Sequence, residues 1–386
     1  MHIDAIDKFE SFSTLKRDWD SVYRADPEAQ FFLSWTWMSS WLSVIGRQNR
    51  WVILAAKLHA DSSTYVAFFP LRFRVKTNQS NGRSYQEIAM AGNRGADYTG
   101  FICVPVFQND AIKAFAECLK QLGWKILNLE FICASDQRIR FLLRQFPRQK
   151  FHIREVEDTN EIDNVNLCRC PYVKLPSDWD SYLDDELSAN CRQKIRRLMK
   201  KIGSSTEFRI THTTEETFDL DLSILLEFWA LKWGGRKGER LDTIRKIYRT
   251  MLMHCLTRDS LFLPVPWKGE VPLGALALLI DAEKRSLLFY VGGRDATVKS
   301  PPPGVVLHAY SIRYAIHRGF TTYDFLRGNE PYKYSFCNEE RRIRHIIVVD
   351  RNAEGRLGST ISVMEANNSL SSGDVTGARA PLSSRS

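Results

Sequence analysis

Four side chains able to handle protons or charge lie close together near the C-terminal end of the sequence, in the segment YDFLRGNEPYKYSF at residues 323–336. They are two carboxylates, a phenol and an ammonium group: Asp324, Glu330, Tyr332 and Lys333. Such a set can supply a general base, a general acid and a cation that holds a substrate. We predict these four residues as catalytic. The alternative is that Glu330 and Lys333, three positions apart, form only a local ion pair.

A second group of residues, just before this segment, has the features of an anion site. An expected strand ends at Gly292 and Gly293, and after a loop with three prolines Gly304 opens a helix. The first turn of a helix leaves backbone amides free, and a glycine there permits close approach of a pyrophosphate. We predict an anion site on the first turn, formed by Gly304, Val305, Val306 and Leu307. The alternative is only a rigid turn into a helix.

The elements around these two groups follow from the periodicity of apolar residues. A helix is expected over residues 305–317 and a strand over residues 322–326. Gly328 breaks that strand, and Pro331 suits the first turn of a following helix. The predicted catalytic side chains would then lie at the same end of a sheet as the anion site.

Six basic residues share one expected helix between Ser188, a natural N-cap, and Gly203, a natural C-terminal stop. They are Arg192, Lys194, Arg196, Arg197, Lys200 and Lys201. Apolar residues at helical spacing occupy the opposite face. The basic face can bind phosphates or nucleic acid, or it can simply be solvated. Because no aromatic residues are interleaved, stacking on single-stranded bases is not supported.

The order of expected elements repeats along the chain. Residues 1–157 and residues 172–350 each begin with helices, continue with antiparallel strands and end with a helix and two strands, and a polar linker at 158–171 separates them. A chain of 386 residues is long enough for two domains. We therefore predict a duplicated α/β (α+β) fold with mixed sheets flanked by helices. Residues 351–386 have the composition of a disordered tail.

Composition narrows the partners and the location. The net charge of +9 favours contact with phosphates on a cofactor, a nucleic acid or an anionic membrane. The eight cysteines lack the paired spacing of a zinc site, so no metal is expected. The first residues do not have the pattern of a signal peptide, and the longest apolar runs are too short to span a bilayer. A cytoplasmic location is the simplest expectation.

Several motifs occur in an order that resembles one known family. They are W..YL at 179–183, LS.N.R..IRR at 187–197, FW at 228–229, PG..L at 303–307 and YDFLRG.E.YK at 323–333, with FFLSWTWMSSWL and ADYTG in the first half. The sequence resembles the cellulose-biosynthesis acetyltransferase family (BcsL/CelD type) of the GNAT superfamily, which is related to the FemAB-type aminoacyl transferases. The resemblance implies two tandem GNAT-like (acyl-CoA N-acyltransferase) domains, with acetyl-CoA or another acyl-CoA as co-substrate.

The resemblance also implies roles for the predicted residues. The donor's pyrophosphate would lie at residues 304–307, where the backbone argument also places an anion. Backbone amides at Tyr290, Val291 and Gly292, on the preceding strand, would bind the donor and stabilise the oxyanion. One of the two predicted carboxylates would take a proton from an amine or hydroxyl acceptor. The phenol would return a proton to the thiolate, and the ammonium group would hold the acceptor or a phosphate.

The predicted function is an acyl-CoA-dependent acyltransferase with a small-molecule or glycan acceptor, in exopolysaccharide, cellulose or cell-envelope biosynthesis alongside polysaccharide-synthesis proteins. The usual GNAT phosphate loop is replaced here by KSPPPG. Two alternatives therefore stay open. The first is a FemAB-like transferase that takes its group from an aminoacyl-tRNA bound by the basic helix. The second is a non-catalytic accessory protein of a polysaccharide-synthesis complex.

Overall fold

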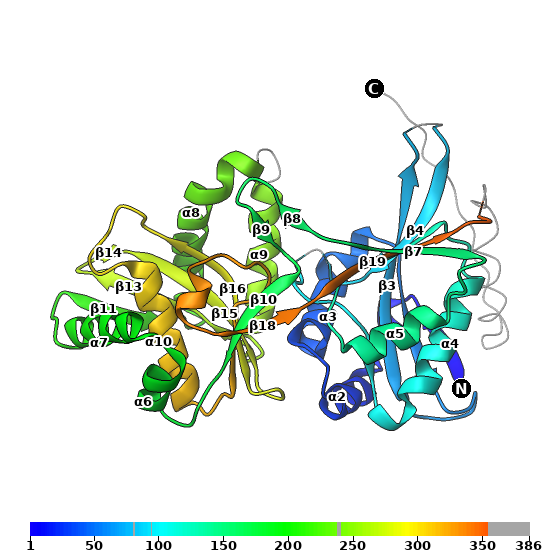
Figure 1. The fold of residues 1–386 in the computed structure, drawn as a ribbon, viewed down its shortest axis with the longest axis horizontal. Coiled ribbons are helices and arrows are strands. Elements are labelled where there is room, and N and C mark those ends of the chain that lie inside the picture. The colour runs from blue at the N-terminus through cyan, green and yellow to red at the C-terminus, as the bar shows by residue number, and fades with distance from the viewer. Residues whose placement is uncertain (80–81, 94, 238–240, 354–386) are drawn as a thin grey trace.

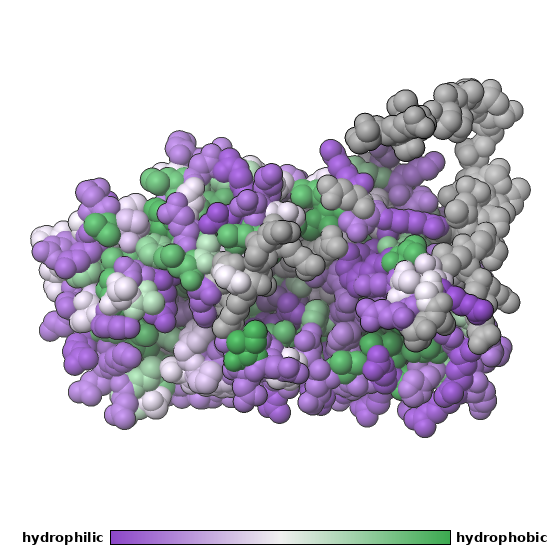
Figure 2. All heavy atoms as spheres, turned by 90° about the horizontal axis from the view of Figure 1, so that it is seen from above, coloured by the Kyte–Doolittle hydropathy of each residue, from purple (hydrophilic) through white to green (hydrophobic). Residues whose placement is uncertain are grey.

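The chain forms a mixed α/β fold in which helices flank two large sheets (Figure 1). The computed structural model describes residues 1–79, 82–93, 95–237 and 241–353. Residues 354–386 of the predicted tail lie outside the described residues. None of the helices within the described ranges combines the length and the apolar character needed to cross a membrane. In the view of Figure 2, hydrophilic side chains cover much of both halves, and apolar ones are scattered between them.

The first sheet has eight strands in the order β1-β2-β3-β4-β6-β19-β7, with β5 paired to β3. Most neighbours are antiparallel, whereas β4 and β6 are parallel. The strands are β1 (His2–Ile6), β2 (Trp51–Lys57), β3 (Ala67–Thr77), β4 (Ser84–Met90), β5 (Ile102–Cys103), β6 (Ile126–Ile132), β7 (Phe151–Val156) and β19 (Arg344–Asp350). Side chains of α4 (Gln108–Gln121) and α5 (Asp136–Arg144) share a separate apolar core with this sheet.

Helices α1 (Phe9–Ser13), α2 (Lys16–Ala25) and α3 (Trp35–Val44) contribute to the other core of this half. Ser34 caps α3, because its side chain accepts a hydrogen bond from the Trp37 amide. Trp37 and Trp41 are fully buried. Their core cluster continues into the second half, where Leu225 and Trp229 belong to it. The two halves are therefore joined by a common apolar core.

The second large sheet has the order β12-β15-β16-β17-β10-β18. Its strands are β10 (Arg169–Lys174), β12 (Leu261–Phe262), β15 (Gly274–Asp281), β16 (Ser286–Arg294), β17 (Thr322–Asp324) and β18 (Glu339–Arg342). Smaller sheets contain β8 (Thr159–Asn160) with β9 (Val165–Asn166), and β11 (Phe208–His212) with β13 (Pro264–Lys268) and β14 (Val271–Pro272). The helices of this half are α6 (Trp179–Ser181), α7 (Ala189–Gly203), α8 (Phe218–Lys237), α9 (Leu241–Leu256) and α10 (Pro303–His317).

The chain returns to the first sheet at its C-terminal end (Figure 1). The second domain predicted from the sequence spans residues 172–350, but β19 lies between β6 and β7 of the first sheet and pairs with both. The reason is packing, since Ile346 and Val348 are buried in the core that α4 and α5 share with the first sheet. The predicted linker at 158–171 contains the β8–β9 hairpin and the start of β10.

Gly293 lets α8 lie directly on β16. A methyl group at this position would lie 2.5 Å from the Trp229 amide nitrogen and 2.6 Å from the Leu225 carbonyl oxygen. Both contacts are to backbone, which cannot swing aside as a side chain can. We expect Gly293→Ala to lower the free energy of unfolding, measured in urea, by about 1–3 kcal/mol or more because α8 must shift.

Gly203→Ala is the matched control for this prediction. Gly203 ends α7, and a methyl group there would meet nothing within 4 Å. We expect this variant to stay within about 1 kcal/mol of the parent and to be stabilised if it changes at all. Equal losses in both variants would contradict the close packing of α8 on β16.

Candidate active site

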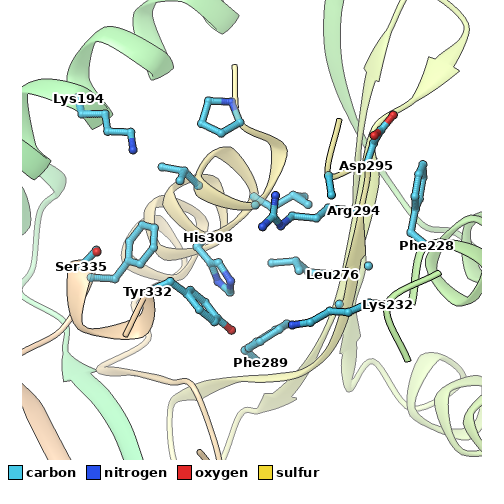
Figure 3. A pocket seen from close by; sticks show the side chains of 18 of the residues that line it. Lys194, Phe228, Lys232, Leu276, Phe289, Arg294, Asp295, His308, Tyr332 and Ser335 are labelled. Carbon is cyan, nitrogen blue, oxygen red and sulfur yellow. The ribbon is translucent and has the colours of Figure 1, made fainter. Parts of the chain in front are cut away.

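A cavity of about 1080 Å³ opens at the end of β16 (Figure 3). It is lined by residues from six places: the end of β16 with the loop after it, Leu276 of β15, the start of α10, the segment that follows β17, the start of α7 and one side of α8. Residues far apart in sequence, such as Lys194, Phe228 and Tyr332, therefore meet in one concave space. Such a cavity is the default place to look for a ligand.

The cavity lies where β16 and β17 part. These parallel strands pair over three residues, the last pair being Leu288 with Asp324. β17 ends there, whereas β16 continues to Arg294 and stays paired with β15 on its other side. Beyond Leu288, no strand of the described residues pairs with the edge of β16 that faced β17. Its backbone N–H and C=O groups can therefore bind an extended ligand, as at any open sheet edge.

A β-bulge in β16 decides which of its side chains face the cavity. Leu278 is paired with Phe289 and Ala277 with Val291, which leaves Tyr290 as the extra residue. Phe289 lines the cavity. Tyr290 instead packs against Trp37 of the first half, with ring centroids 5.5 Å apart.

The three strand residues predicted to meet the donor are therefore divided. Gly292 lines the cavity, whereas Val291 belongs to the core cluster on the side of Tyr290. The side chains of Tyr290 and Val291 face away from the cavity, so only their backbone groups are available to a donor on the open edge.

The start of α10 brings most of the predicted anion site to the cavity. Gly304, Val305 and Leu307 line it, whereas Val306 is buried elsewhere. The helix has no side-chain cap. A methyl group at Gly304 would lie 2.9 Å from Cδ of Arg294, so glycine allows the Arg294 side chain to lie across the helix start. A guanidinium group beside an uncapped helix N-terminus is a favourable place for an anion.

Two further cations line the cavity, Lys194 and Lys232 (Figure 3). Lys194 comes from the predicted basic helix, which is α7 and is capped by Ser188 as predicted. The basic residues of α7 have different environments, because Arg192 and Arg196 both pair with Asp184, at 3.1 and 3.0 Å. Part of the charge of the helix is therefore structural, and part faces the cavity.

Of the four predicted catalytic residues, Tyr332 is the one that lines the cavity. Lys333 is only 2 % exposed, and its ammonium donates to the Arg327 and Gly328 carbonyls at 2.8 and 2.9 Å. It also lies 2.9 Å from Glu330, which is the local ion pair that the sequence left open. The expected helix after Pro331 is replaced by a single 3-10 turn, Lys333–Ser335.

Asp324 lies away from the cavity and is 1 % exposed. The Tyr98 hydroxyl is 2.9 and 3.1 Å from its two oxygens, and the Leu326 amide donates to it at 2.8 Å. Arg341 lies 3.4 Å from the same carboxylate. Asp324 thus connects the second sheet to Tyr98 of the first half, a contact that a local sequence pattern does not reveal.

Sequence reasoning missed His308, which lines the cavity and is 4 % exposed. Its Nδ1 lies 2.9 Å from the hydroxyl oxygen of Tyr323. Burial lowers the pKa of His308 to about 3, and the charges of Lys333 and Arg294 act in the same direction. The imidazole is therefore neutral at physiological pH. One feature of the sequence could have indicated His308: it is a polar residue among the apolar residues of the buried face of α10.

The segment from α7 to the turn after β17 provides the link to known proteins. Residues 189–334 match the family model described as an acetyltransferase (GNAT) domain. The cavity-lining parts of α7, α8, β16 and α10 all fall within this GNAT domain. No curated protein matches the sequence. Within the described residues, no group of three or more His, Cys, Asp or Glu side chains is arranged to hold a metal ion.

The fold of most of the chain is similar to that of solved structures, among them the following two. The crystal structure of FemX matches with a TM-score of 0.61 at 10 % identity, covering 90 % of this chain and 98 % of that one. A conserved protein of unknown function from Bacteroides thetaiotaomicron VPI-5482 matches with a TM-score of 0.56 at 9 % identity, covering 91 % and 100 %. At such identities the similarity concerns the fold alone. It extends over both halves of the chain and not only over the residues that match the GNAT model.

The contacts of Lys333 predict that its loss affects stability. We expect Lys333→Met to lower the free energy of unfolding by about 3 kcal/mol, since two carbonyls and the Glu330 carboxylate lose their partner. Lys200→Met, at an exposed position of α7, should change it by about 0.5 kcal/mol at most. The measurement is denaturation in urea. A Lys333→Met protein as stable as the parent would contradict a structural role for this ammonium.

Proposed function

We propose that this chain transfers an acyl group from a CoA thioester, acetyl-CoA or another acyl-CoA, to an amine or hydroxyl acceptor. One observation carries the proposal: within a GNAT domain, a single cavity joins a cationic helix start to the open edge of β16. The first feature suits the phosphates of the donor. The second suits its amide-containing arm, which can pair with a strand edge.

The donor's phosphates would lie at the start of α10, held by the Gly304 amide and the Arg294 guanidinium, with Lys194 and Lys232 adding positive charge. The thioester would lie beside the bulge of β16. Backbone amides at residues 290–292 are proposed to stabilise the oxyanion that forms there. The bulge supports this role because it interrupts regular pairing at Tyr290.

Proton transfer is assigned among the predicted residues by cavity lining for the acid and by exposure of the carboxylate for the base. Tyr332 lines it and is proposed to protonate the departing thiolate. Of the two carboxylates, Asp324 is enclosed by Tyr98 and Arg341, whereas Glu330 is 33 % exposed beside Tyr332. Glu330 is therefore the better candidate for the base. Lys333 holds the turn that presents Tyr332.

The biological setting rests on the sequence resemblance alone. We propose a small-molecule or glycan acceptor, and a role beside polysaccharide-synthesis proteins in cellulose, exopolysaccharide or cell-envelope biosynthesis. A cytoplasmic location is part of the same proposal.

Binding of the donor is the experiment that tests this proposal. We expect saturating acetyl-CoA to stabilise the protein, because a ligand at a hundred times its Kd adds about 2.7 kcal/mol. In calorimetry, Arg294→Gln should raise the Kd by about tenfold or more, since hydrogen bonds to charged groups are strong. Arg209→Gln, where the native guanidinium pairs with Glu270 on the surface, should leave the Kd unchanged. If no CoA thioester binds, the result would contradict the proposal and support the alternative of a non-catalytic accessory protein.

A second candidate donor is an aminoacyl-tRNA, and the basic face of α7 favours it. Arg197, Lys200 and Lys201 are exposed on the helix whose Lys194 reaches the cavity. If this donor is used, tRNA binding measured by filter retention should weaken steeply with salt. It should also fall by at least tenfold on the double change Lys200→Glu and Lys201→Glu. Salt-insensitive binding, or binding unaffected by these changes, would exclude this use of α7.

A further inference from the structure

The cavity contains one side chain whose proton can be located from its contacts, His308 of α10 (Figure 3). Its Nδ1 lies 2.9 Å from the Tyr323 hydroxyl oxygen. Tyr323 is completely buried, and in the part of the chain that the structure describes this hydroxyl has no other hydrogen-bond partner. The hydrogen bond between the Tyr323 hydroxyl and Nδ1 of His308 therefore has to satisfy both groups.

The tautomer of His308 follows from this constraint. A phenolic O–H is a donor that needs an acceptor when it is buried, and the acceptor within reach of Tyr323 is Nδ1. Nδ1 then carries the lone pair, and the ring proton of the neutral imidazole is on Nε2. The opposite arrangement would leave a buried O–H with no acceptor, which native structures avoid.

The second nitrogen of His308 is directed at the cavity, because the first is directed at Tyr323 in the core. Nε2 has no hydrogen-bond partner among the described residues. Aromatic rings surround the imidazole, with Phe289 at a centroid distance of 4.7 Å and Tyr332 at 5.7 Å. Phe289 immediately precedes the bulge of β16. A single N–H donor in apolar surroundings thus lies beside the open strand edge.

Burial and the charges around the ring keep it neutral. Burial is the largest cause that disfavours a charged imidazole, and the cations Lys333 and Arg294 act in the same direction, so that the pKa lies at about 3. The titratable neighbours Tyr323 and Tyr332 are phenols, neutral at physiological pH. His308 therefore does not change its charge between pH 5 and 8.

We propose that His308, with its tautomer fixed by Tyr323, donates its Nε2–H to the carbonyl oxygen of the bound thioester. This rests on the proposed function. When the acceptor attacks, a bond forms to the carbonyl carbon, the proton of the acceptor passes to the proposed base Glu330, and an electron pair moves to the carbonyl oxygen. There the hydrogen bond from Nε2–H stabilises the negative charge. The pair then returns, the C–S bond breaks, and the thiolate leaves and is protonated by another group. The proton of His308 stays on Nε2 throughout.

This role differs from that of a general base. A base needs a lone pair directed at the acceptor, and in this tautomer the only lone pair of the imidazole is on Nδ1, which accepts the hydrogen bond from Tyr323. The substitution His308→Gln separates the two roles, because the new amide N–H can occupy the place of Nε2–H while it cannot accept a proton as a base. The substitution His308→Leu removes both.

The tautomer can be measured without any ligand. In the full-length protein labelled with ¹⁵N-histidine, the His308 signals are assigned by their loss in His308→Gln. We expect the Nε2–H tautomer throughout pH 5–8, and a mixture of tautomers in Tyr323→Phe. An Nδ1–H tautomer, or a titration of His308 between pH 5 and 8, would overturn the proposal.

The contact with the donor is tested by infrared spectroscopy of acetyl-CoA labelled with ¹³C at its carbonyl. We expect the bound carbonyl stretch at lower frequency than in free acetyl-CoA. The shift should be largely kept in His308→Gln and lost in His308→Leu. Tyr310→Phe is the control, since Tyr310 is on the same helix but pairs with His212 outside the cavity.

Calorimetry on the same samples separates the two levels of the argument. If neither acetyl-CoA nor any other CoA thioester binds the parent protein, the proposed function is refuted, whereas the ¹⁵N result would still decide the tautomer. Acetyl-CoA that binds with the same carbonyl stretch in the parent and in His308→Leu would refute the role of His308 alone.

Discussion

The parting of β16 from β17 is the constraint on which the site depends. The two strands pair over three residues, and the chain after β17 then turns away. The Asp324 carboxylate holds this turn by accepting a hydrogen bond from the Leu326 amide. Leu326 has φ of +57°, a left-handed conformation that a residue with a side chain rarely adopts. Gly328, with φ of +97°, continues the turn. Asp324, which the sequence predicts as catalytic, thus holds the turn that leaves the edge of β16 open to a ligand.

The first half of the chain supports this gap from behind. Tyr98 of the first half holds Asp324, and Trp37 packs on Tyr290 at the bulge. In the second half, the backbone of α8 packs directly against Gly293 and so fixes the position of the end of β16. Because the halves share one apolar core, the geometry of the cavity is a property of the whole fold and not of the GNAT domain alone. In addition, the backbone itself connects the two halves, because the chain passes from the second half into β19 of the first sheet.

Features that depend on neighbouring residues could be predicted from the sequence, whereas features that depend on distant partners could not. Ser34 and Ser188 were recognisable as helix caps because a cap bonds to an amide three residues ahead. The start of a helix at Gly304 was also recognisable from the residues next to it in the sequence. The position of β19 was not, because its partners in β6 are more than 200 residues earlier in the sequence. His308 was missed because its defining contact, Tyr323, is on the next strand.

The electrostatics of the cavity connect donor binding to the state of His308. Arg294 lies at the helix start where an anion would bind, and Lys333 holds the turn beside Tyr332. Both cations also lower the pKa of His308, after the larger effect of burial. Cations at the place where the proposed polyanionic donor would bind thus also oppose a positive charge on the imidazole. A histidine kept neutral can serve there as a hydrogen-bond donor at any physiological pH, but it cannot serve as a proton reservoir. Burial and these cations together therefore decide which kind of chemistry His308 can contribute.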